Sequence, residues 1–245
     1  MYKYSYLQAC LSIAPFWFFF FISRSDLRET MLKLSFLFGI GGVLSEFVYI
    51  NDWWNPVTVT GTAVGIEDFL FGFFFSGSVA VCYEVICKSC YLDSPPPITK
   101  PFRFRYIALT ICAVFFGSAY LFNLDSFTAT ILAFGVCNLI ILSLRQDLVA
   151  NAVFSGVFAG LLALLFFGIP ELITSGWVNA TWSMDYLSGH FVLYVPREDF
   201  IWFLLAGIFI GPLYKVWKNK RILHLNEPVP LSTWALLQKR YAKQQ

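Results

Sequence analysis

Charged residues are scarce in this chain. Only 13% of its 245 residues are Asp, Glu, Lys or Arg, whereas 58% are hydrophobic and 20% are aromatic. Because about a quarter of the residues in a soluble domain are charged, this composition excludes an ordinary soluble domain and indicates an integral membrane protein. The apolar residues form continuous runs instead of alternating with polar ones, which favours a bundle of helices over a barrel of strands.

Patterns typical of metal and nucleotide sites are also missing. The chain has only two histidines, His190 and His224. The Cys87-x-x-Cys90 pair has no second pair of Cys or His residues to complete a zinc site, and no glycine-rich phosphate-binding motif is present. We therefore expect neither a metal site nor a nucleotide-binding fold.

Seven apolar runs are long enough to cross a bilayer, which takes about 20 residues. They cover residues 4–22, 30–49, 66–87, 106–123, 127–144, 148–174 and 199–217. Pro15 and Pro212 lie inside the first and last runs and predict a kink in each, because proline removes a backbone donor. Pro95-Pro96-Pro97 predicts a stiff linker that divides the chain into two parts.

The distribution of Lys and Arg predicts the orientation in the membrane. With seven spans, all of the 17 Lys and Arg residues except Lys3 and Arg197 fall on the side opposite the N-terminus. Since positively charged loops stay in the cytoplasm, we expect the N-terminus outside and the C-terminus in the cytoplasm.

The chain carries one pattern twice. Glu67-Asp68 and Glu198-Asp199 each open an apolar run. Further pairs that match in spacing are Trp54 with Trp182, Gly61 with Gly189, and Glu84 with Lys215. This pattern indicates an internal duplication with an acidic pair in each copy.

We interpret the fold as an all-α, polytopic membrane helix bundle of about seven transmembrane helices. Two parallel three-helix repeats would be joined by a connector helix, with a cavity where the repeats meet. The first repeat is expected at residues 1–90, the linker and connector helix at 91–125, the second repeat at 126–221, and a cytoplasmic tail at 222–245.

The acidic pairs are the strongest candidates for chemistry, because acids at a membrane boundary are costly. A carboxyl group in apolar surroundings keeps its proton more readily than one in water and can serve as a proton donor. Successive residues of a helix point about 100° apart, so both acids of one pair cannot face one cavity. We expect Glu67 and Glu198 to carry the chemistry, and Asp68 and Asp199 to support them or cap the helix. The alternative is that Glu67 and Glu198 only stabilise helix N-termini.

Three further residues leave two readings open. Glu46, late in the second span, is either a supporting partner of these acids or close enough to the interface to be hydrated. Trp54 and Trp182 belong either to an interfacial aromatic belt or, because they recur at matched spacing, to a functional surface.

At these residues the chain resembles the lycopene cyclase domain family, twice over. The resemblance is carried by residues 4–21, 54–61 and 66–71 in the first copy, and by residues 182–189, 196–202 and 211–217 in the second. The family's acidic motif appears as Ile66-Glu67-Asp68-Phe69-Leu70 and as Pro196-Arg197-Glu198-Asp199-Phe200-Ile201. Gly65 takes the place of the proline that usually precedes the first copy.

The resemblance implies a lycopene β-cyclase-like isomerase, an intramolecular lyase that closes β-type rings at the ends of lycopene or a related acyclic carotenoid. A protonated carboxyl would add a proton to the terminal double bond, the next double bond would attack the cation, and a base would remove a proton. No net redox change occurs, so no cofactor is expected. The implied substrate contacts are Trp54, Asn55, Pro56, Phe69, Trp182, Pro196, Phe200 and Trp202.

The expected partners are a long polyene that enters from the lipid, membrane lipids and other enzymes of carotenoid synthesis, and no nucleic acid. The sequence leaves two other functions open. Three spans, a connector and three spans in parallel orientation is also the plan of small membrane transporters. A non-catalytic carotenoid-binding subunit is the second alternative.

Overall fold

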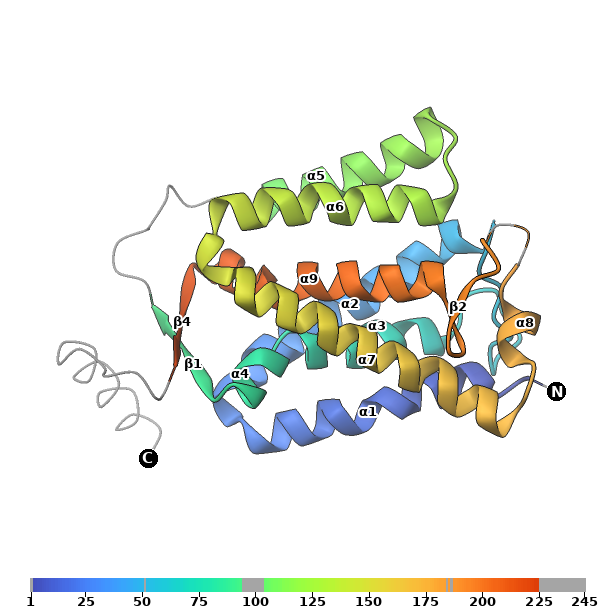
Figure 1. Cartoon of the computed structure of the whole chain (residues 1–245), viewed down its shortest axis with the longest axis horizontal. Coiled ribbons are helices and arrows are strands. Elements are labelled where there is room, and N and C mark those ends of the chain that lie inside the picture. The colour runs from blue at the N-terminus through green and yellow to red at the C-terminus, as the bar shows by residue number, and fades with distance from the viewer. Residues whose placement is uncertain (1, 51, 94–103, 184, 186, 225–245) are drawn as a thin grey trace.

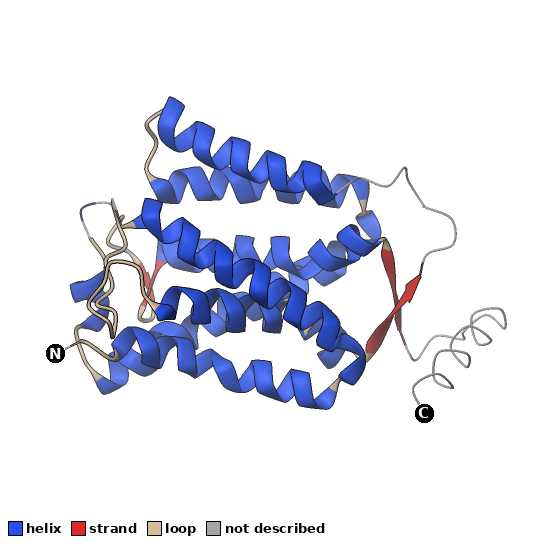
Figure 2. Ribbon diagram, turned by 180° about the vertical axis from the view of Figure 1, so that it is seen from behind, coloured by secondary structure: helices blue, strands red, loops and turns tan. Residues whose placement is uncertain are grey.

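The computed structural model describes residues 2–50, 52–93, 104–183, 185 and 187–224. In this part of the chain the helices run side by side in one bundle, with the N-terminus at one end and strands β1 and β4 at the opposite end (Figure 1). Figure 2 shows that strands occur at the ends of the bundle and not along its length. The Pro95-Pro96-Pro97 linker and most of the predicted tail at 222–245 lie outside the described residues.

The helices are α1 (Ser5–Ser23), α2 (Arg28–Tyr49), α3 (Ile66–Val79), α4 (Cys82–Ile86), α5 (Phe104–Phe116), α6 (Ser126–Leu144), α7 (Val149–Ile173), α8 (Trp177–Thr181) and α9 (Arg197–Lys218). The 3-10 turns η1 (Ser25–Leu27) and η3 (Gln146–Leu148) precede α2 and α7, and the π-helical turn η2 (Gly117–Leu121) continues α5. Strands β1 (Ser89–Asp93) and β4 (Lys220–His224) pair with each other, as do β2 (Phe191–Val192) and β3 (Val195–Pro196).

Six helical segments within the described residues are long and apolar enough to cross a membrane. They are Ser5–Ser23, Ser25–Tyr49, Phe104–Leu121, Ser126–Leu144, Gln146–Ile173 and Arg197–Lys218. Each coincides with one of the seven predicted spans, and α1 and α9 continue past Pro15 and Pro212. The predicted all-α, polytopic bundle is therefore confirmed.

The third predicted span, residues 66–87, is a broken helix. It consists of α3 and α4, which together run from the α8 end of the bundle to the β1 end (Figure 1). In a continuous helix the carbonyl of Ala80 would accept a hydrogen bond from the backbone of Glu84. Here the Lys215 Nζ donates to this carbonyl at 3.0 Å. A side chain of α9 thus satisfies a backbone group that the break leaves free.

Small residues bring the helices of each half close together. A side chain at Gly42 of α2 or Gly72 of α3 would collide with the backbone of the facing helix. Gly207 of α9 would collide in the same way with the backbone of Ser155 in α7. Close approach at small residues is a common way to pack helices in membranes, and it fixes which face α3 and α9 turn inward.

Residues in corresponding positions of the two copies meet at the α8 end of the bundle. Trp54 pairs with Trp182 in an isolated antiparallel bridge. The residue after each tryptophan donates its backbone N–H to the carbonyl of the residue before the other tryptophan, at 3.0 and 2.9 Å. Gly61 and Gly189, the glycines that follow at matched spacing, both have a φ of 72°.

Residues in corresponding positions of the two copies also meet at the opposite end of the bundle. In the antiparallel β1–β4 pair, Tyr91 stands opposite Ile222, and these residues follow Glu67 and Glu198 at equal spacing. Arg24 and Arg145 each form two hydrogen bonds with the aspartate two residues further on. Each arginine also donates at 2.8 Å to the first carbonyl of a strand, in β1 and β4 respectively.

We call residues 5–93, from α1 to β1, the first half and residues 126–224, from α6 to β4, the second half. Within them, α2 packs on α3 and α7 packs on α9. Between the halves, α1 packs closely on α7, whereas α2 and α6, the corresponding pair, scarcely touch. Helix α5 packs on the outer side of α6. The loose pair, α2 and α6, borders the cavity described next.

Candidate active site

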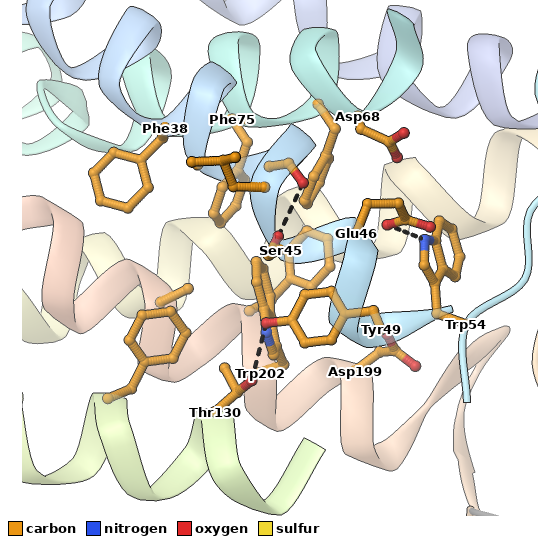
Figure 3. Close-up of a pocket in the computed structure, with 18 of the residues that line it drawn as sticks. Phe38, Ser45, Glu46, Tyr49, Trp54, Asp68, Phe75, Thr130, Asp199 and Trp202 are labelled. Carbon is orange, nitrogen blue, oxygen red and sulfur yellow. Dashed lines mark hydrogen bonds between the residues drawn. The ribbon is translucent and has the colours of Figure 1, made fainter. Parts of the chain in front are cut away.

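A cavity of about 380 Å³ lies between the two halves. Its walls come mainly from α2, α3, α6, α7 and α9, with α5 at one side, and Figure 3 shows part of the lining. Most of the wall is aromatic, including Phe71, Phe75, Phe134, Phe166 and Phe203. A carrier for polar solutes needs a passage lined with polar groups, whereas this cavity is lined mainly with aromatic rings. The cavity therefore suits an apolar ligand.

Three carboxyl groups line this cavity, those of Glu46 on α2, Asp68 on α3 and Asp199 on α9. All three side chains are buried, and no Lys, Arg or His is among the described residues that line the wall. A buried carboxylate without a nearby cation is costly. The cavity therefore combines acids with apolar rings, and it supplies no basic side chain to neutralise them.

Both carboxyl oxygens of Asp68 accept hydrogen bonds. The Tyr6 hydroxyl donates to Oδ1 at 2.7 Å, and the backbone N–H of Gly65 donates to Oδ2 at 2.7 Å. The second contact is part of the N-terminal cap of α3. Asp68 thus caps its helix, as the sequence predicted, and at the same time faces the cavity.

Glu46 keeps one oxygen free for a ligand. The indole N–H of Trp54 donates to its Oε2 at 3.0 Å, as Figure 3 shows, whereas its Oε1 is buried and has no hydrogen-bond partner in the described part of the chain. The ring of Trp54 packs edge-on against Tyr6 and lies 4.4 Å from that of Trp182. Of the two readings of Glu46, the buried partner of the other acids is the one that fits.

Asp199 is the least satisfied of the three acids. Its Oδ2 is buried and accepts no hydrogen bond from any described residue. The indole of Trp182 approaches the carboxyl group without reaching hydrogen-bond geometry. Phe127, which precedes Arg145 at the spacing at which Tyr6 precedes Arg24, carries no hydroxyl and packs against Trp53 instead.

Glu67 and Glu198, the acids expected to carry the chemistry, do not line the cavity. Glu67 Oε1 accepts the backbone N–H of Val59 at 2.7 Å, and Glu198 Oε1 accepts that of Ser188 at 3.0 Å. Both glutamates are buried, and each ties the preceding loop to the start of its helix. The helix rotation therefore turns the second acid of each pair, Asp68 and Asp199, toward the cavity.

Three of the eight expected substrate contacts line the cavity, namely Trp54, Trp182 and Trp202. The other five do not: Asn55, Pro56, Phe69, Pro196 and Phe200. Phe69 lies against Gly39 of α2, Phe200 lies toward Gly160 of α7, and Pro196 belongs to the β2–β3 hairpin.

Two tyrosines of the site have no sequence motif. Tyr6 holds Asp68, and the Tyr49 hydroxyl shares a hydrogen bond of 2.9 Å with Thr130 across the α2–α6 pair. The indole of Trp202 lies next to the Tyr49 hydroxyl. Tyr6 lies in residues 4–21, which carry part of the family resemblance, but nothing in the sequence marked either tyrosine apart from the many other aromatic residues of the apolar runs.

A family model described as lycopene cyclase matches residues 125–217, from the N-cap of α6 into the last turn of α9. Residues 125–217 are a lycopene cyclase domain. The matched region is less than half of the chain, and it supports membership of the lycopene cyclase family and, in general terms, a carotenoid cyclase. Together with the six apolar helices, the match makes it an integral membrane protein. The match includes Trp182, Asp199 and Trp202 of the cavity.

No curated protein and no solved structure matches the chain.

Proposed function

We propose that this lycopene cyclase family member closes β-type rings at the ends of lycopene or a related acyclic carotenoid, by an acid-initiated and redox-neutral reaction. The observation that carries the proposal is the cavity itself, in which Glu46, Asp68 and Asp199 face an aromatic chamber, with no basic side chain among the described residues of its lining. This combination suits a reaction that passes a proton to and from a hydrocarbon.

The ring closure needs a proton donor. The neutral acid transfers its proton to the terminal double bond, which leaves a tertiary carbocation, and the neighbouring double bond attacks it to form the ring bond. Asp199 and Glu46 are the candidate donors, because each has a buried oxygen with no hydrogen bond in the described residues. An oxygen that no other described group binds is free to face the substrate.

The reaction ends when a base removes a proton from a carbon next to the cation. Asp68 is the candidate for this step, because hydrogen bonds from Tyr6 and Gly65 stabilise a carboxylate. The proton gained and the proton lost balance, so no electron carrier or other cofactor is consumed. In this proposal Asp68 and Asp199 take the catalytic roles, and Glu67 and Glu198 position the loops.

The walls of the cavity support the cation. The faces of Phe71, Phe75, Phe166, Phe203 and Trp202 carry partial negative charge, which attracts a cation within about 6 Å. Their apolar surface also excludes water, which would capture the carbocation before the ring forms.

The two halves are proposed to be parallel repeats related by a two-fold axis along the bundle. The reciprocal Trp54–Trp182 contacts and the Tyr91–Ile222 pairing support this arrangement. Since both halves contribute an aspartate to one cavity, we propose one reaction centre that treats the two ends of a substrate in turn. With α3 and α4 as the seventh crossing, the N-terminus is proposed to lie outside and the C-terminus in the cytoplasm.

The experiment is expression in a bacterium that accumulates lycopene, followed by pigment analysis. We expect β-ring products in cells with the wild-type chain and unchanged lycopene in cells with Asp199→Asn at equal levels of inserted protein. Lycopene left untouched by well-inserted wild-type protein would contradict the proposal.

A further inference from the structure

Four residues line the cavity and are also exposed on the outside of the bundle. They are Gly41 and Leu44 of α2, and Cys112 and Phe116 of the α5–η2 segment. Leu44 is 63% exposed and Phe116 is 47% exposed. A residue that belongs to both surfaces stands at the rim of an opening, so the cavity opens sideways between α2 and α5.

The rim residues lie midway along apolar helices, so the opening faces the lipid. Cys112 lies in the middle of the apolar segment Phe104–Leu121, and all four rim residues are apolar or weakly polar. Ile40 and Phe47, the neighbouring residues of α2, are also exposed, at 56% and 61%. An opening with such a border meets hydrocarbon chains and not the aqueous phase.

The opposite side of the bundle is closed. There α1 packs on α7, and the ring of Phe158 lies 5.9 Å from the rings of both Phe16 and Phe20. At the α8 end, the Trp54–Trp182 ring contact at 4.4 Å spans the two halves. On the α2–α6 side the helices are joined near their ends by the Tyr49–Thr130 hydrogen bond, and α5 covers the outside. Because α2 and α6 pack less closely than α1 and α7, the cavity stays open on the side of α2 and α5.

The cavity is too small to enclose a whole carotenoid, so most of the substrate has to extend out through this opening. A volume of about 380 Å³ lies at the small end of the range for ligand pockets. Ring closure requires only the end group of the substrate inside, and a stiff conjugated chain cannot fold up behind it. The remaining chain is apolar, so it gains more from a lipid-facing exit than from a polar loop region.

We propose that the opening between α2 and α5, bordered by Gly41, Leu44, Cys112 and Phe116, admits the polyene from the membrane and holds its unreacted part during ring closure. This inference rests on the proposed function, because it names the path of the same substrate. It assigns a binding role to α5, which carries none of the acids.

Gly41 provides a way to narrow the opening without disturbing the fold. A Cβ atom added there meets no other atom within 4 Å, and the same holds for Gly135 of α6, which does not line the cavity. Both glycines lie inside helices, where a larger residue raises the helix propensity. Substitutions at Gly135 are therefore the matched control for those at Gly41.

The experiment compares Gly41→Ala, Gly41→Leu and Gly41→Trp with the same changes at Gly135, and adds Cys112→Trp on the other side of the rim. Membranes with equal amounts of each variant are assayed with lycopene over a range of concentrations. We expect kcat/KM to fall with the size of the side chain at Gly41, by about tenfold or more for Gly41→Trp and Cys112→Trp. The loss should fall mainly on KM, because the acids are untouched, and Gly135→Trp should stay within about twofold of wild type.

A binding readout separates this inference from the chemistry. In the Asp199→Asn background, we expect the protein purified from lycopene-accumulating cells to retain pigment, and the added Gly41→Trp change to reduce the retained amount by about tenfold. Wild-type rates in both Gly41→Trp and Cys112→Trp would overturn the opening while the proposed function stands. An equal loss in Gly135→Trp would also overturn it. A wild-type chain that forms no rings would instead overturn the proposed function.

Discussion

The two halves present the same acid to the cavity but surround it differently. Asp68 of the first half is held by the Tyr6 hydroxyl at 2.7 Å. Asp199 of the second half has an oxygen without a partner in the described residues, and Phe127 occupies the position that corresponds to Tyr6. In the proposed reaction these two carboxyl groups in corresponding positions have different tasks, one to accept a proton and the other to give one.

A second difference concerns the tryptophans that meet across the halves. The Trp54 indole donates to Glu46 at 3.0 Å. The residue that corresponds to Glu46, at equal spacing after the arginine of each half, is Phe167, and its ring packs 4.7 Å from that of Trp182. The first half thus contributes an extra acid and the second half an extra ring, so the site is one asymmetric centre and not two equal ones.

The largest effect on activity is expected when each of the two aspartates is replaced separately. Because both serve one cavity, we expect Asp68→Asn and Asp199→Asn each to lower ring formation by about 10³-fold, within the usual range for a general acid or base. The measurement is the rate of cyclisation of lycopene in membranes matched for protein content. A variant that retains near-wild-type activity would show that its half is dispensable.

A large loss of stability is expected from replacing either residue of the buried Glu84–Lys215 ion pair, where the two halves carry opposite charges. Glu84 and Lys215, which correspond in spacing, form an ion pair at 2.9 Å with both side chains fully buried. Removing one partner leaves a buried charge unpaired, which costs about 3–5 kcal/mol, so Glu84→Gln and Lys215→Met should lower the thermal stability of the detergent-purified protein.

The exchanged double variant, Glu84→Lys with Lys215→Glu, is the control for this pair. We expect it to recover part of the lost stability because it restores opposite charges. Single variants as stable as wild type would show that the pair does not hold the halves together.

Removing the Tyr6 hydroxyl, which has no counterpart at Phe127 in the second half, is expected to have a smaller effect on activity than removing an aspartate. Hydrogen bonds to charged groups contribute about 1.5–3 kcal/mol, so Tyr6→Phe should slow cyclisation by about tenfold or more if Asp68 acts as a carboxylate. The converse change, Phe127→Tyr, adds a hydroxyl at the corresponding position of the second half. Kinetic assay of both variants sharpens the comparison, and unchanged activity in Tyr6→Phe would remove the basis for giving Asp68 the role of base.

The smallest effects are expected from the acids that precede the aspartates. Glutamine can still accept the loop N–H that Glu67 or Glu198 accepts, so Glu67→Gln and Glu198→Gln should cost about 1 kcal/mol of stability and leave most of the activity. The check is thermal unfolding together with the cyclisation rate. A loss as deep as that of the aspartate variants would return the catalytic role to the glutamates.

The spans could be predicted from the sequence because length and apolarity alone define them. The break between α3 and α4 could not, because the hydrogen bond that replaces a backbone contact at Ala80 comes from Lys215, a residue far along the chain. The family resemblance and the doubled acidic pair were also readable, since both are local patterns.

The face of each acid could not be predicted in the same way. The sequence indicated that only one acid of each pair can face the cavity, but the choice depends on how α3 is rotated. That rotation is set by close contacts such as Gly42 against the backbone of Asp68, which appear only when the helices pack. The contacts of Tyr6 and Glu46 could not be predicted for the same reason, because they form only when the helices that carry these residues pack together.

The most direct test of the account is ring formation by the wild-type chain in deuterated water. If a cavity acid starts the reaction, the proton that it adds comes from exchange with solvent and stays on a different carbon from the one that loses a proton. We predict that the mass of the product rises by one deuterium for each ring formed. Rings without deuterium would contradict the claim that protonation by a carboxyl group begins the cyclisation.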